Sequence, residues 1–137
     1  MTKYFTVEEA NKTLPLVRRI VEDIESAHAQ LLERVEEYRS LGRDAEAEVA
    51  RRAEVEEELQ ELTDRVNGFL EELEQIGALF KGFGAGLVDF HSTLDERPIF
   101  LCWKLGEERI EWWHDLEAGY AGRQRLPEHL VSFGGSE

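Results

Sequence analysis

The sequence predicts an α+β protein in which a long antiparallel helical hairpin, similar to a coiled coil, carries a small three-stranded antiparallel sheet. Two observations predict this class. Apolar residues recur at alternating steps of three and four over most of residues 7–80, which is the spacing of helices that bury one stripe. Beyond residue 86 the apolar spacing becomes two, which is typical of strands. We therefore expect a single domain over 1–137, with the helical hairpin in 1–81 and the sheet and a C-terminal loop in 82–137.

The first predicted helix begins at a capping box. Thr6 can accept a hydrogen bond from the backbone of Glu9, and the Glu9 carboxylate can reach back to the backbone of Thr6. The apolar stripe keeps its phase on both sides of Pro15, so Pro15 is expected to kink the helix and not to end it. Gly42 is expected to end this helix, and Asp44 to cap the next one.

The second predicted helix starts weakly and then becomes clear. Only small residues mark 45–53, whereas a regular stripe runs from Val55 to Phe80. Two helices of about 35 residues joined by a tight turn form a hairpin about 50 Å long. The glycine-rich segment 82–86 is expected to be a hinge from helix to strand, because a phosphate-binding loop has a strand before it and a helix after it.

Three strands are predicted after this hinge, over 87–90, 99–105 and 109–114, with a turn at 106–108 between the last two. The favoured pairing of these last two sets Trp103 opposite Trp112 and a lysine opposite a glutamate.

This predicted register also assigns the two faces of the sheet. His114 lies on the face of Trp103, while Trp113 lies on the other face, opposite Cys102. Trp113 is therefore expected on the outer face, as a contact for a partner or a ligand. Cys102 is expected to be buried and inert, since no base is visible beside it.

Composition excludes several classes of function. The 137 residues include 16 basic and 30 acidic side chains, which gives a formal net charge of −14. That charge repels phosphate backbones and anionic lipids, so we expect no nucleic-acid partner and no membrane partner. A single cysteine excludes an internal disulfide framework and is too few for a cysteine-based zinc site. The first residues resemble no secretory signal, and a cytoplasmic protein is expected.

The densest group of possible metal ligands is His114, Asp115 and Glu117, at the end of the last predicted strand. Imidazole and carboxylate groups together suit Zn, Fe, Mn or Ni. A catalytic metal site keeps three protein ligands and an open position. His114 and Glu117 can supply two ligands, and Asp89 or His91 from a neighbouring strand end can supply a third.

Other readings of this group remain open. Glu71 or Glu74 on the second helix is another possible ligand. The group can also be purely structural, with His114 packed on its neighbours and Asp115 capping a turn.

Arg123, together with Tyr120 and Trp113, forms a second candidate site. A guanidinium can clamp a carboxylate or a phosphate with two parallel hydrogen bonds, so this group is a candidate ligand-binding site. The alternative is that Arg123 pairs with an acidic residue of the chain and pins the C-terminal segment to the body.

Several segments resemble the bacterial domain of unknown function 2203 family. They are Phe5-Thr6-Val7-Glu8-Glu9-Ala10-Asn11 with Leu14-Pro15, Gly86-Leu87-Val88-Asp89-Phe90, Leu101-Cys102-Trp103-Lys104-Leu105-Gly106-Glu107, and residues 112–124. The resemblance implies a small bacterial protein with no established activity. A small residue or proline usually follows Asp-Phe in that pattern, so His91 departs from it, which argues against a shared role for His91.

The first function that the sequence predicts is a structural or interaction module that self-associates through its helices as a homodimer. Ile20, Leu32, Leu41 and Leu70 lie beside the apolar stripes, and a small sheet covers only about half of such a hairpin. The alternatives are a metal-binding protein or metal-dependent enzyme at the His114 group, and a small-ligand binder that uses Trp113 and Arg123.

Overall fold

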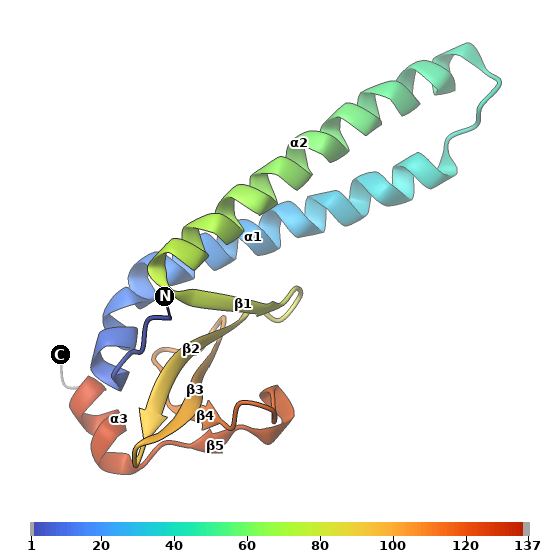
Figure 1. Cartoon of the computed structure of the whole chain (residues 1–137). Coiled ribbons are helices and arrows are strands. Elements are labelled where there is room, and N and C mark those ends of the chain that lie inside the picture. Colours follow the sequence, from blue (N-terminus) through green and yellow to red (C-terminus); the bar gives the residue numbers. More distant parts are fainter. Residues whose placement is uncertain (1, 136–137) are drawn as a thin grey trace.

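The computed structural model describes residues 2–135. Two long helices, α1 (Val7–Ser40) and α2 (Glu46–Ile76), form a hairpin, and an antiparallel sheet packs at its open end (Figure 1). The predicted α+β class and the helical hairpin are confirmed. Among the described residues, neither long helix carries an apolar stretch that would span a bilayer.

Helix α1 begins as its sequence predicts. The Thr6 hydroxyl accepts a hydrogen bond from the Glu9 backbone at 3.0 Å, and the Glu9 carboxylate accepts one from the Thr6 backbone at 2.9 Å. Pro15 lies inside the helix and does not end it. The C-cap residue is Leu41, one residue before Gly42.

Helix α2 departs from expectation at both ends. Its N-cap residue is Ala45 and makes no side-chain cap, so the predicted cap at Asp44 was wrong. The helix ends at Ile76, and its C-cap residue, Gly77, has a φ of 102°, a left-handed conformation that glycine adopts without strain. The chain then reverses into a strand, and Phe80, expected on the helix, lies in that strand.

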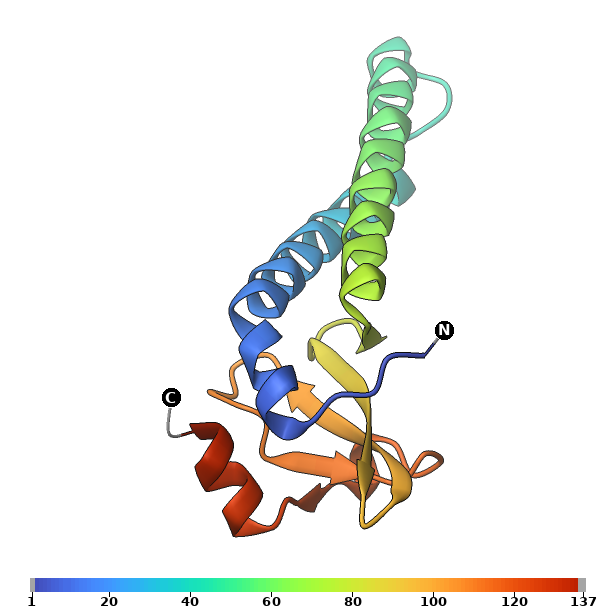
Figure 2. The same ribbon diagram turned by 60° about the vertical axis from the view of Figure 1, so that its left-hand side comes forward.

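The sheet has five strands where three were expected. In chain order, which is also their order in the sheet, they are β1 (Ala78–Gly82), β2 (Leu87–Leu94), β3 (Arg97–Lys104), β4 (Trp112–His114) and β5 (Gln124–Arg125). The two additional strands, β1 and β5, form the edges. A 3₁₀ turn, η1 (Tyr120–Gly122), precedes β5, and α3 (Glu128–Gly135) follows it and packs against α1 (Figure 2).

The pairing of β3 with β4 differs by one residue from the predicted register. Leu101 lies opposite Trp113, and Cys102 lies opposite Trp112. The chain leaves the ladder after Lys104, because Ile110 is fully buried in the core and its backbone donates to the Asn11 side chain at 2.8 Å. The predicted turn at 106–108 is thus part of a longer loop that packs on α1.

Because of this shift, each side chain of β4 lies on the opposite face of the sheet from the one that was predicted. The face toward the helices holds the buried side chains of Val88, Phe90, Leu101, Trp103 and Trp113, which join α1 residues in the main core. Trp113 is therefore a core residue and not a contact on the outer face. His114 moves to the outer face, which it shares with Asp89 and Cys102.

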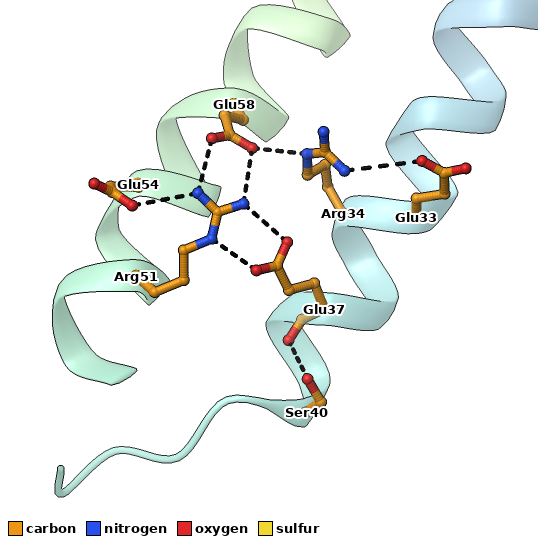
Figure 3. Close-up of polar contacts among 7 residues, drawn as sticks. All are labelled: Glu33, Arg34, Glu37, Ser40, Arg51, Glu54 and Glu58. Carbon is orange, nitrogen blue, oxygen red and sulfur yellow. Dashed lines mark hydrogen bonds and ion pairs between the residues drawn. The ribbon is translucent and has the colours of Figure 1, made fainter. Parts of the chain in front are cut away.

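The part of the hairpin beyond the sheet has a small apolar core and a network of ion pairs. Ala27, Leu62 and Val66 form its separate buried cluster. Closer to the turn, Arg51 binds the Glu37 carboxylate at 2.7 and 2.9 Å (Figure 3). These hydrogen bonds lower the pKa of Glu37 below its usual range.

A second link of the same network, between Arg34 and Glu58, also joins α1 to α2. Arg51 binds Glu58 of its own helix at 3.1 Å, and Glu58 also accepts from Arg34 of α1 at 2.7 Å (Figure 3). Pairs exposed to solvent are weak singly, so the connected arrangement is what aligns this end of the hairpin.

The observed register predicts unequal costs for two neighbouring indoles. Trp113→Ala is expected to lower the free energy of unfolding by about 3–5 kcal/mol, because it empties a core position. Trp112→Ala is expected to lower it by less than half as much, because that indole is half-buried and lies against Arg123 and Arg125. Urea unfolding of both variants measures the difference, and equal losses would contradict this register.

Candidate metal centre

Three buried polar groups from three strands meet on the outer face of the sheet. Asp89 of β2 and Cys102 of β3 are direct cross-strand partners, and His114 of β4 lies diagonally beyond Cys102. Their exposed fractions are 4%, 1% and 2%. One carboxylate oxygen, the thiol sulfur and one imidazole nitrogen all lie within 4.8 Å of one another.

The backbone fixes the orientation of the His114 ring. Its Nδ1 lies 2.8 Å from the carbonyl oxygen of Asp115. A carbonyl only accepts, so Nδ1 carries the hydrogen and donates. The other nitrogen, Nε2, is directed at Asp89, 3.1 and 3.2 Å from its two carboxylate oxygens. Metal-bound histidines are commonly held in this way, with one nitrogen tied to a carbonyl and the other facing the ion.

Burial governs the ionisation of the other two groups. It raises the pKa of the Asp89 carboxyl, and the attraction of His114 opposes that rise. It also raises the pKa of the Cys102 thiol to about 11, with the nearby charge of Asp89 adding to the effect. The thiol therefore keeps its proton near neutral pH unless a cation is present to stabilise the thiolate.

The arrangement does not fit nucleophilic catalysis by Cys102. A nucleophilic cysteine needs a low pKa or a base that accepts its proton. Both nitrogens of His114 are already engaged, one by the Asp115 carbonyl and one by Asp89. Nitrogen, sulfur and oxygen donors converging on one point instead match the ligands that Zn²⁺ takes in proteins.

The three groups line a cavity of about 330 Å³. The remaining lining residues are Lys81, Leu87, Phe100, Leu116, Glu117, Gly119 and Tyr120. Most of them belong to the outer face of the sheet or to the loop that follows β4. The buried donors are thus in contact with a space large enough for a small molecule.

The structure brings together only part of the predicted metal group. Asp89 and His114 meet directly, and Glu117 lines the same cavity with an exposed side chain. Glu71 and Glu74 lie on the exposed surface of α2.

Asp115 and His91 are placed elsewhere. The Asp115 carboxylate forms an ion pair with Arg97 at 3.5 Å, so only its backbone carbonyl touches the site. The His91 ring packs between Tyr4 and Phe100, at centroid distances of 5.6 and 4.7 Å.

The predicted ligand clamp, Arg123, already holds a carboxylate of its own chain. It binds Glu107 at 2.7 and 3.0 Å and donates to the Cys102 carbonyl at 3.2 Å. Its guanidinium also lies over the rings of Tyr120 and Trp112. These contacts match the alternative reading, in which Arg123 pins the C-terminal segment to the body.

Cys102 was missed by sequence reasoning, which judged it inert and a single cysteine too few for a cysteine-based zinc site. It belongs here to a mixed set of donors. A signal did exist: a two-residue turn at Asp95-Glu96 sets Asp89 opposite Cys102. Both turn residues have positive φ, for which glycine or asparagine is the usual sign, so the turn was hard to locate.

The fold and the site define a class: an α+β protein with a helical hairpin, whose sheet holds a buried carboxylate, thiol and imidazole on the face away from the helices. The chain belongs to the family of uncharacterised conserved proteins called DUF2203, whose model matches residues 3–126. The resemblance noted from the sequence is thereby confirmed, and the matched span includes all three donors. No curated protein and no solved structure matches the chain.

The raised pKa of Cys102 predicts how its thiol reacts with a disulfide reagent in protein that has been treated with a chelator. Reaction with a disulfide reagent requires the thiolate, so its rate is expected to rise about tenfold per pH unit up to about pH 10. In denaturant, the rate of the same reaction is expected to level off once the pH exceeds about 8.5, the ordinary pKa of a thiol. A folded-state plateau at or below that pH would contradict the assigned burial.

Proposed function

We propose that this protein binds a divalent transition metal, with Zn²⁺ the best match, through Asp89, Cys102 and His114. The observation that carries the proposal is the convergence of three buried donors within 4.8 Å of one another. Donor atoms around a tetrahedral zinc ion lie roughly 3–4 Å apart. Small rotations of side chains that are already neighbours are enough to close this set.

Charge supports the same proposal. A buried carboxylate and a buried thiolate are unfavourable without a cation, and burial raises the pKa of both Asp89 and Cys102. A divalent ion neutralises both charges, and the thiol proton leaves when it binds. Among the candidate metals Zn, Fe, Mn and Ni, the thiol favours Zn, because thiolate is a poor ligand for Mn and a good one for Zn.

Three protein ligands leave one coordination position free. Structural zinc sites use four protein ligands, whereas catalytic sites use three and keep one position for water or substrate. The cavity beside the donors gives that position access to a small molecule. We therefore propose that the metal binds or activates a ligand and does not only stabilise the fold.

A thiol ligand remains available only where it is kept reduced, which supports a cytoplasmic location. The net charge of −14 argues against nucleic acid as a partner.

Elemental analysis of untagged protein tests the proposed site. Wild-type protein is expected to contain about one metal ion per chain, and zinc added to stripped protein is expected to raise its Tm by mass action. Cys102→Ser and His114→Gln are each expected to lose most of the bound metal. His91→Gln is the matched control, because His91 shares the outer face but lies outside the donor group, and it is expected to retain the metal.

Two outcomes would overturn the metal site. One is wild-type protein that contains no metal and shows no change of Tm with added Zn²⁺. The other is metal that His91→Gln loses and Cys102→Ser retains.

We propose, second, that the hairpin self-associates to form a homodimer. The observation in favour is Leu32, an apolar side chain of α1 that is 56% exposed. The hairpin itself projects beyond the sheet (Figure 1). The other apolar residues on which the sequence argument rested are covered within the chain: Ile20 is buried, and Leu41 and Leu70 are half-buried. Leu32 therefore carries this proposal.

Light scattering tests the dimer. Wild-type protein is expected at twice the chain mass of 15.8 kDa, and Leu32→Glu is expected to yield monomers, because it places a charge in the contact. Leu16→Glu is the matched control: Leu16 is 48% exposed on the same helix and lies nearly opposite to Leu32 around its axis. A wild-type mass near 15.8 kDa at tens of micromolar protein would refute the dimer.

A further inference from the structure

We infer that the cavity beside the metal centre binds a small monocarboxylate with a short apolar body. This inference rests on the proposed metal site and adds the class of its ligand. It is carried by two lysines, Lys81 of β1 and Lys104 of β3. Neither has an ion-pair partner within the part of the chain that the structure describes, and both lie against rings that line the cavity.

The two lysines come from different strands, and of the two only Lys81 lines the cavity itself. Lys81 lines it directly, with its Nζ 5.6 Å from the centroid of the Phe100 ring. Lys104 places its Nζ 5.7 Å from the centroid of the Tyr120 ring. The three arginines of the same region are already paired, Arg97 with Asp115, Arg123 with Glu107, and Arg125 with Glu111.

The balance of charge at the cavity favours a single negative charge on the ligand. A divalent ion held by the Asp89 carboxylate and the Cys102 thiolate makes a neutral centre. Lys81 and Lys104 then contribute two positive charges and Glu117 one negative charge. A surplus of one positive charge at this point, in a chain of net charge −14, selects an anion, and one with a single charge.

A carboxylate fits better than a phosphate. Near neutral pH a phosphate group carries between one and two negative charges, whereas a carboxylate carries the single charge that matches the surplus at this cavity. Arg123 is the guanidinium nearest the donors, and Glu107 occupies its fork. A carboxylate oxygen can instead take the free position of the metal, and the lysines can act on it as point charges.

The rest of the lining sets the size and polarity of the ligand. Leu87, Phe100 and Leu116 offer apolar surface, and the volume of about 330 Å³ lies at the low end for ligand cavities. The ligand that matches is a short-chain carboxylate whose acid group faces the metal and whose body contacts these three side chains.

Cobalt(II) in place of zinc provides a direct readout, since its visible d–d bands respond to a new ligand at the metal. We expect 4-methylpentanoate to change these bands in a saturable way, and the neutral isostere 4-methylpentanamide to leave them unchanged. Lys81→Gln is expected to lower the affinity for 4-methylpentanoate by about two- to fivefold, the range for an exposed charge pair, and to leave the binding of cobalt unaltered. Lys12→Gln on α1, which packs on the opposite face of the sheet, is the matched control and is expected to bind like wild type.

The outcomes separate this inference from the metal site. Cobalt binding with a thiolate charge-transfer band, but with d–d bands that do not respond to the carboxylate, overturns the ligand class and leaves the metal site standing. Failure to bind cobalt or zinc overturns both. An equal response to the amide, a stronger response to inorganic phosphate, or an unchanged affinity in Lys81→Gln overturns the monocarboxylate assignment.

Discussion

The pairing of β3 with β4 decides which side chains pack on the helices and which face the cavity. Side chains alternate along a strand, so a shift of one residue exchanges the two faces. With Leu101 opposite Trp113, that indole enters the core and His114 turns to the face of Cys102. Ile110 supports this register, because its burial against α1 holds the loop between the two strands away from the ladder.

The loop after β4 orients His114 and forms one wall of the cavity. Its first carbonyl, at Asp115, accepts from His114 Nδ1 and so turns Nε2 toward the other donors. Its far end is tied to β3 by Arg123, which binds Glu107 and the Cys102 carbonyl. Three rigid strands thus supply the donors, and an anchored loop supplies a wall of the cavity. The fold alone thus holds these three groups in place, which limits the ordering that binding of an ion would require.

The helices were predictable because their period and the capping box at Thr6 are local signals. The short strands were not. Residues 78–80 continue the apolar stripe of the helix before them, and 124–125 are too few to form a pattern. The turn at 95–96 lacks glycine and asparagine despite its positive φ values. The sequence predicted that His114 and Asp89 lie close together at neighbouring strand ends. It did not predict that Cys102 lies beside them, because the turn at 95–96 sets the pairing of Asp89 with Cys102.

In the proposed site, one thiolate, one imidazole and one carboxylate bind a metal and leave one coordination position free. X-ray absorption at the zinc edge of zinc-loaded protein tests it most directly, because sulfur is distinguished from nitrogen and oxygen in the ion's surroundings. The proposed site predicts one sulfur at about 2.3 Å from the zinc and about three nitrogen or oxygen atoms at about 2.0–2.2 Å, one of them from solvent or ligand. A zinc ion with no sulfur, or with two or more, would contradict the account.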